Sequence, residues 1–342
     1  MSEALIEVIA GGIGNSIQDE GRFGFRHMGI TVSGCLDPLL SRCANALLGN
    51  APDCACIEIR AVGPTLRVKR GCVRLALAGE IGAKLRRIDG TLREMSAWTS
   101  FTLDSQEVLE IATLPDGGSA YLAVSGGIDS PLQLGSRSTY QRAVMGGIDG
   151  KPIVTGNLLP CATQRHRQYR ECQAAAWSQG EGPIRVVLGP QVDHFTPEAV
   201  RQFLASEYRV TPQTDRMGMR LEGVQLAHAS AQAADIVSDG VTPGAIQVPG
   251  NGQPIILLVD CQTVGGYPKI ATVIGADLPR LGQLKPGECI RFAAVSGAEA
   301  RQALLVREAQ WRAWANRIVA YMSDGPSLDD DLSDAWIASD WS

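Results

Sequence analysis

The feature that most limits the fold of this chain is a series of short strand-like runs separated by turn-forming residues. Each run is apolar or β-branched and is bounded by Gly, Pro, Asp or Asn, which is the pattern of short β-strands. The expected strands cover residues 5–9, 67–69, 73–78, 108–113, 120–124, 184–188, 255–260 and 290–294. Such a series favours barrels or sandwiches over a doubly wound α/β sheet, in which strands alternate with helices.

Few segments show helical periodicity. Residues 38–48 predict a helix with Asp37 as its N-cap and Gly49 after its last turn. Residues 197–204 predict a second short helix, and residues 299–322 predict a long one with an apolar stripe. The fold class predicted from these patterns is mainly β, with few short helices and a C-terminal helix.

Composition and a weak internal sequence similarity divide the chain into parts. Residues 19–29 and 214–223 share the order Asp, Arg, Gly, Arg, Gly, which indicates two related barrels in tandem. We predict an N-terminal β-rich half over 1–160, a linker over 161–182, a C-terminal barrel half over 183–296, a helix over 297–322 and an acidic flexible tail over 323–342.

The net charge of −5 is unevenly distributed. Six acidic residues and no Lys or Arg follow Ser323, so the residues up to that point carry a net charge of +1. A nearly neutral body gives no electrostatic basis for binding nucleic acid or an anionic membrane. No apolar run reaches the ~20 residues of a membrane helix, and the first residues lack the pattern of a signal peptide. We therefore expect a cytoplasmic protein.

Cysteine and histidine patterns offer no metal site. The nine cysteines are odd in number and include no CxxC pair, so reduced and mostly buried thiols are the simplest interpretation. The four histidines form no HExxH or HxH motif, and no metal is predicted in this chain. The sequence also lacks a GxxxxGK[ST] phosphate loop, a GxGxxG fingerprint and a GxSxG elbow.

Residues 16–37 are polar where a purely structural sequence would be apolar. They bring Asp19, Arg22, Ser33 and Asp37 together with four glycines. This composition predicts either a substrate-binding loop or a structural network in which Asp19 caps turns and Arg22 holds backbone carbonyls. A second polar stretch, residues 134–140, offers hydroxyls and a guanidinium that suit an anion.

Residues 238–272 form the most informative polar segment. Gln247 lies in an otherwise apolar strand and Gln262 lies just past the next one. An amide side chain both donates and accepts hydrogen bonds, which suits a ureido or lactam group. Lys269 follows Pro268, which predicts an ammonium that projects from a rigid turn as a charge stabiliser or an acid/base. An ordinary surface charge is the alternative.

Eight stretches in a fixed order carry a resemblance to a known family. They are 18–22 (QDEGR), 33–37 (SGCLD), 126–129 (GGID), 134–140 (LGSRSTY), 189–191 (GPQ), 215–220 (DRMGMR), 244–249 (GAIQVP) and 262–270 (QTVGGYPKI). Together they resemble the biotin-dependent carboxyltransferase, or allophanate hydrolase subunit 2, family over residues 6–292. That family includes the C subunits of bacterial ATP-dependent 5-oxoprolinases and is similar to one half of the carboxyltransferase domain of urea carboxylase.

The resemblance implies cyclophilin-like β-barrels and a B-like partner subunit that shares a cleft with this chain. With an A-like subunit as well, the complex would use ATP to open the lactam of 5-oxoproline to glutamate. Two alternatives stay open. One is a carboxyltransferase subunit that acts on a urea- or guanidine-like nitrogen with biotin on a partner, since no Met-Lys-Met attachment pattern is present here. The other is a non-catalytic partner that antagonises a kinase inhibitor.

Residue chemistry at the family motifs gives the candidate site. Polarising an amide or ureido carbonyl requires hydrogen-bond donors and cations that stabilise a developing oxyanion. The predicted catalytic residues are Gln262, Tyr267 and Lys269. The predicted substrate-binding residues are Asp19, Arg22, Ser33, Asp37, Asp215, Arg216, Arg220 and Gln247.

Overall fold

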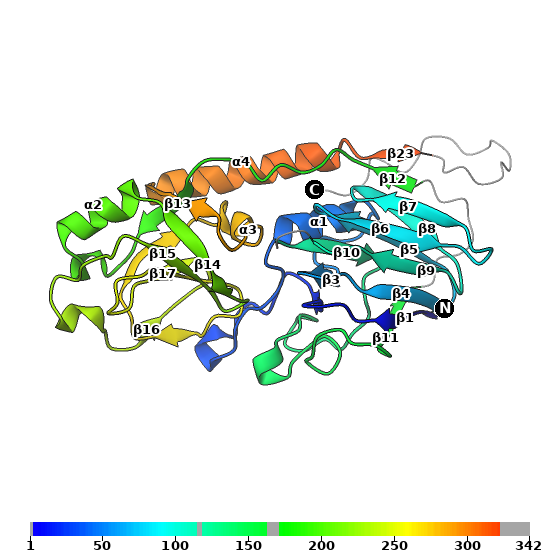
Figure 1. The fold of residues 1–342 in the computed structure, drawn as a ribbon, viewed down its shortest axis with the longest axis horizontal. Helices are drawn as coiled ribbons and strands as arrows, with labels where there is room; N and C mark the ends of the chain where they lie inside the picture. The colour runs from blue at the N-terminus through cyan, green and yellow to red at the C-terminus, as the bar shows by residue number, and fades with distance from the viewer. Residues whose placement is uncertain (1–2, 115–117, 163–170, 322–342) are drawn as a thin grey trace.

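The structure is a computed structural model that describes residues 3–114, 118–162 and 171–321. Two β-rich halves lie side by side, and helix α4 (Gly297–Ala315) runs along both of them (Figure 1). The mainly β prediction, with few helices and one long helix near the C-terminus, is confirmed. The predicted acidic tail lies outside the described residues, and no helix within them is long and apolar enough to span a membrane.

Two sheets build the N-terminal half. The first has the strand order β11 (Leu158–Ala162), β1 (Glu3–Ala10), β4 (Thr65–Arg70), β9 (Val108–Ile111), β6 (Gly82–Arg86), β7 (Leu92–Ser96). The second has the order β2 (Ser16–Gln18), β3 (Cys56–Ile59), β10 (Ala120–Val124), β5 (Val73–Ala78), β8 (Thr99–Leu103), β12 (Glu171–Gln173), β23 (Val319–Tyr321). Buried apolar side chains from both sheets form one core.

Strand β5 packs against the sheet core with one face and against a helix with the other. Val73 and Leu75 belong to the core of the two sheets, whereas Ala76 and Ala78 belong to a cluster with helix α1 (Pro38–Ala46). Side chains alternate between the faces of a strand, so large residues fill one side and small ones let a helix approach on the other.

The C-terminal half is a nearly closed barrel. Its sheet has the order β21 (Cys289–Ile290), β14 (Tyr208–Thr214), β15 (Gly218–Gly223), β18 (Ile255–Leu257), β17 (Ala245–Gln247), β20 (Lys269–Val273), β13 (Ile184–Leu188), β22 (Phe292–Ala294). Only Arg291 separates the two edge strands, β21 and β22, so the chain itself brings the edges of the sheet together.

Smaller elements complete this half and the loops between the halves. Strands β16 (Asp239–Gly240) and β19 (Val264–Gly265) form a two-stranded sheet, and α2 (Pro197–Ala205) and α3 (Leu278–Leu281) are short helices. The 3-10 helices are η1 (Arg26–Met28), η2 (Gln141–Ala143), η3 (Val192–His194) and η4 (Gln232–Ala234).

Helix α4 is shorter than the sequence predicts. It begins with a capping box between Ser296 and Glu299 and ends at Ala315, and residues 319–321 form β23 instead of a last helical turn. β-branched side chains favour strands, and β23 pairs with β12 at the edge of the seven-stranded sheet. The predicted linker contains β12 as well, and its residues 163–170 lie outside the described part. Trp311 and Leu304 both belong to the predicted apolar stripe of α4, but only Trp311 of the two is buried, and Leu304 is half exposed.

Candidate functional site

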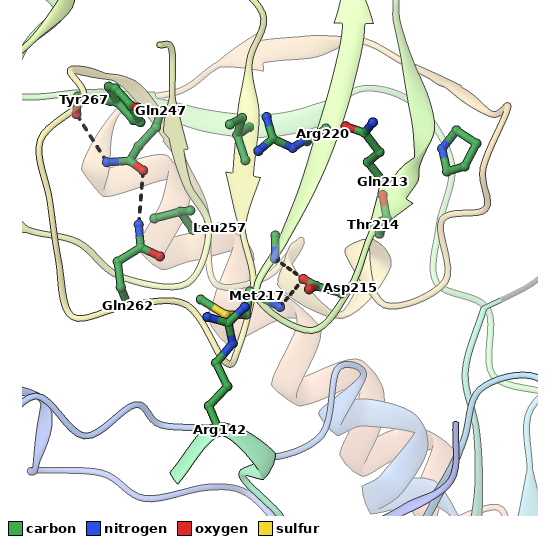
Figure 2. A pocket seen from close by; sticks show the side chains of 13 residues that line it. Arg142, Gln213, Thr214, Asp215, Met217, Arg220, Gln247, Leu257, Gln262 and Tyr267 are labelled. Carbon is green, nitrogen blue, oxygen red and sulfur yellow. Dashed lines mark hydrogen bonds between the residues drawn. The ribbon is translucent and has the colours of Figure 1, made fainter. Parts of the chain in front are cut away.

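A pocket of about 580 Å³ lies on the C-terminal barrel where the N-terminal half meets it (Figure 2). Its walls come from strands β14, β15, β17 and β18, from the turn and loops beside them, and from η2 of the other half. The volume lies within the range of about 300–1,000 Å³ that is usual for small-molecule sites. The predicted residues that line the pocket are Asp215, Arg220, Gln247, Gln262 and Tyr267.

The two glutamines meet at one end of the pocket. Gln262 Nε2 donates to Gln247 Oε1 at 3.5 Å, and Gln247 Nε2 donates to the backbone carbonyl of Tyr267 at 3.3 Å (Figure 2). Gln247 is buried in β17 between β18 and β20, which fixes its position. A primary amide has two N–H donors, so each glutamine keeps one for a ligand. This end of the pocket therefore suits a lactam, amide or ureido group.

Arg26 fixes the backbone of Gln262 from the opposite half. Its Nη2 donates to the carbonyl of Gln262 at 2.9 Å and to that of Val241 at 2.6 Å. The sequence placed Arg26 within the polar segment 16–37 but did not select it as a site residue. A second arginine that the sequence missed, Arg142, lines the pocket from η2. It lies two residues after the polar stretch 134–140, and that proximity was the only indication in the sequence that Arg142 belongs to a site.

Lys269 is not where the sequence placed it. It begins strand β20 and is 4% exposed, so the alternative of an ordinary surface charge is wrong. Its Nζ donates to Asp239 Oδ2 at 2.6 Å and to the carbonyl of Gly240 at 3.1 Å, and it does not line the pocket. The hydrogen bond from Lys269 holds the pKa of Asp239 below its usual range. Lys269 thus ties the β16–β19 pair to the barrel wall that carries Gln247.

Arg216 joins the two halves instead of lining the pocket. Its guanidinium donates to Asp260 Oδ2 at 2.8 Å, to Glu58 Oε1 at 2.5 Å and to the carbonyl of Gly34 at 2.6 Å. Burial alone lowers the pKa of Arg216, but the carboxylates of Glu58 and Asp260 outweigh it and raise that pKa. The charge of this arginine is therefore already neutralised within the protein.

Arg22 and Asp19 form the loop network that the sequence left open as an alternative. Arg22 is fully buried and donates to the backbone carbonyls of Gln133 and Ser138. The Asp19 carboxylate accepts hydrogen bonds from the Ser136 hydroxyl and from backbone N–H groups. These contacts join the 16–37 segment to the 130–147 loops, and a substrate-binding role for either residue stays a prediction.

Ser33 and Asp37 also lie outside the pocket lining. Ser33 is buried with φ +55°, and its backbone N–H donates to the carbonyl of Val259 at 3.0 Å across the two halves. Asp37 is the N-cap of α1 and accepts from the N–H groups of Leu39 and Leu40 at 3.1 Å. Burial raises the pKa of Asp37 to about 7, although its hydrogen bonds oppose that shift.

Asp215 faces the pocket but uses its carboxylate locally. Its Oδ1 accepts from the N–H groups of Met217 at 2.7 Å and Gly218 at 3.1 Å, which shapes the turn between β14 and β15 (Figure 2). Across the described ranges, no group of three or more His, Cys, Asp or Glu side chains is placed to hold a metal ion.

Comparison with known proteins gives consistent matches along the chain. Residues 28–294 match the carboxyltransferase domain, subdomain A and B. The chain is 34% identical over 302 residues to the C subunit of 5-oxoprolinase from Escherichia coli, with 87% of this chain and 94% of that protein covered. It is 30% identical over 318 residues to urea amidolyase of Saccharomyces cerevisiae, with 86% of this chain but only 17% of that protein covered.

Solved structures extend the similarity to the fold. The urea carboxylase of Kluyveromyces lactis superimposes with a TM-score of 0.82 at 26% identity, which covers 96% of this chain and 32% of that one. The urea amidolyase of the same yeast gives a TM-score of 0.81 at 26% identity, which covers 98% of this chain and 22% of that one. In both cases this chain corresponds to one part of a much longer polypeptide.

Proposed function

The chain belongs to the family defined by the carboxyltransferase domain, subdomain A and B, and we propose that it is the C-type subunit of an ATP-dependent 5-oxoprolinase complex. In this proposal the complex opens the lactam of 5-oxoproline to glutamate, with B-like and A-like partner subunits. The observation that carries the proposal is the convergence of Gln247 and Gln262 in one pocket. The extent of the match to the E. coli protein, 94% of its length, supports it.

The pocket suits the polar part of this reaction. The remaining N–H groups of Gln247 and Gln262 donate to the lactam carbonyl, and the Gln262 oxygen accepts from the lactam N–H. Hydrogen bonds aimed at a carbonyl that gains negative charge lower the barrier to attack on its carbon, and one such donor raises the rate by about 10²–10³-fold. The exposed phenol ring of Tyr267 closes the same end.

Lys269 has a positioning role in this proposal. It does not line the pocket, but Asp239 and Gly240, which accept its hydrogen bonds, form β16. Strand β16 pairs with β19, which leads into the loop that carries Tyr267. Lys269 therefore holds the wall against which the amide pair is placed.

In this proposal the complex uses ATP, and the ATP site is not located in this chain. The described walls of the pocket come from strands, turns and η2, and they include no helix N-terminus whose backbone N–H groups would hold a triphosphate.

The second candidate is a urea carboxylase-type carboxyltransferase. The structural match to the K. lactis enzyme over 96% of this chain favours it. The ureido ring of biotin on a partner presents a carbonyl acceptor beside N–H donors, as a lactam does with its single N–H, and Gln247 and Gln262 are the residues that would hold it.

Reconstitution tests the proposal. The chain is purified alone and with its A-like and B-like partners, and ATP-dependent formation of glutamate from 5-oxoproline is measured. We expect no activity for the chain alone and turnover for the complex. The variant Gln262→Leu should lower kcat about 100-fold, whereas Gln232→Leu, an exposed position on η4, serves as the matched control.

A folded complex that forms no glutamate would overturn the proposal. Avidin-sensitive carboxyl transfer to urea in the same preparation would support the second candidate in its place.

A further inference from the structure

Arg142 is a cation from the N-terminal half that lines a pocket otherwise built by the C-terminal half. Figure 2 shows its side chain extending from η2 toward the strands of the barrel. None of the acidic side chains in the described ranges forms an ion pair or hydrogen bond with the guanidinium of Arg142 or with that of Arg220 on β15. Both arginines are exposed in the pocket.

One acid, Asp215, shares the pocket and offsets at most one of the two positive charges. Asp215 accepts from two backbone N–H groups, so its carboxylate is held in its own turn. The pocket therefore has two guanidinium groups against one carboxylate, which makes it net positive, with the amide pair Gln247–Gln262 at one end. Guanidinium groups bind carboxylates through two parallel N–H···O bonds, which makes them specific for that shape.

The segment that carries Arg142 is rigid. Tyr140 and Met145 exchange two backbone hydrogen bonds around η2, at 2.8 and 3.1 Å. Val144 has φ +52°, a conformation that is rare for a β-branched residue and persists only where the surroundings impose it. Gly150 packs so closely on Val144 that a Cβ at position 150 would overlap its backbone. Arg142 is thus presented to the pocket from a fixed support.

From these observations we infer that Arg142, assisted by Arg220, binds the carboxylate of a small substrate whose amide or lactam group lies against Gln247 and Gln262. Ile255, Leu257 and Met217 also line the pocket and offer apolar contacts to the hydrocarbon part of such a ligand. This inference rests on the proposed function, because 5-oxoproline is a lactam that carries one carboxylate. It adds the residue that distinguishes this acid from neutral amides and from urea, which has no carboxylate.

The experiment compares two ligands that differ only at the predicted contact. L-5-oxoproline carries a carboxylate, and 5-oxoprolinamide carries a neutral carboxamide in the same place. Steady-state KM and kcat of the reconstituted complex are measured for the wild type, Arg142→Met, Arg142→Lys and the control Arg201→Met. Arg201 pairs with Glu198 on the surface of α2, away from the pocket.

We expect Arg142→Met to raise KM for 5-oxoproline at least 10-fold with kcat within threefold, and Arg142→Lys to recover part of the loss. For the carboxamide, wild type and Arg142→Met should have the same KM within twofold, and Arg201→Met should match the wild type for both ligands. Equal losses for the acid and the amide would overturn the inference, because they would indicate a change in the pocket and not the loss of a carboxylate contact.

Failure of the proposed function is distinguished by direct binding. If the complex does not turn over 5-oxoproline, the same two ligands are titrated into the full chain with its partners by calorimetry. Tighter binding of the acid that Arg142→Met abolishes keeps the carboxylate site and rejects only the reaction. Equal binding of acid and amide, or binding of neither, overturns the carboxylate site itself.

Discussion

Replacing Arg216 by Met tests whether one buried ion network holds the two halves together. The guanidinium side chain is 15% exposed and lies between Glu58, which is fully buried, and Asp260, which is 9% exposed. Removing the guanidinium takes away the hydrogen-bond donor of Glu58 Oε1 and the donors of both carboxylate oxygens of Asp260. Glu58 Oε2 keeps its two donors, the Leu36 N–H and the Tyr121 hydroxyl, both at 2.8 Å.

The magnitude follows from those contacts. Removing one partner of a buried ion pair costs about 3–5 kcal/mol, because the other charge stays buried without compensation. We expect a loss of about 4 kcal/mol in the free energy of unfolding, since Glu58 keeps two of its three hydrogen bonds. Arg220→Met, four residues along the chain at an exposed position, should change this free energy by less than about 0.5 kcal/mol.

Urea-induced unfolding followed by circular dichroism measures both variants. A loss below 1 kcal/mol, or one equal to that of Arg220→Met, would refute the role of this network.

Three further outcomes are expected. Lys269→Met should lower the activity of the complex more than tenfold and change Tm by less than about 4 °C, because Asp239 is half exposed and stays hydrated; unchanged activity would remove Lys269 from the site. Burial raises the pKa of Asp37 from 3.8 to about 7, so wild-type stability falls as the pH rises through that window, and Asp37→Asn should gain about 3–4 kcal/mol on the wild type between pH 4 and pH 8 by urea unfolding; an equal difference at both pH values would contradict this. Trp311→Ala should cost about 3–5 kcal/mol of unfolding free energy, since Trp311 is buried and packs on Arg42 of α1 at 3.9 Å, and a loss below 1 kcal/mol would show that α4 is not part of the core.

Local sequence patterns predict most of the fold. The predicted strands at 73–78, 120–124 and 184–188 agree with β5, β10 and β13 to the residue. Strands buried on one or both faces must be apolar at fixed spacing, and the turns between them need Gly, Pro, Asp or Asn, so both signals are local. The end of α4 was not predictable in this way, because residues 319–321 become a strand only by pairing with β12, about 150 residues earlier.

In the candidate site, too, local sequence predicts some features and distant residues decide the others. Gln247 and Gln262 could be predicted because an amide inside or beside an apolar strand is costly unless it has partners. Lys269 was predicted to project from the turn after Pro268, but Asp239, 30 residues away, covers it and pairs with it. A sequence shows that a residue is chemically unusual for its place, but distant residues decide whether it faces a ligand or another side chain.

Three arginines around the pocket show how these distant residues assign roles. Arg216 has two carboxylates brought to it from both halves, so its charge serves the interface. Arg26 has backbone carbonyls of the C-terminal half as acceptors, so it positions Gln262. Within the described residues Arg142 contacts neither a carboxylate nor a backbone carbonyl, and the proposed ligand carboxylate would take that place. Because the three side chains are chemically identical, the acceptors that folding brings to each one determine its role, and a substrate carboxylate at Arg142 would complete the pattern.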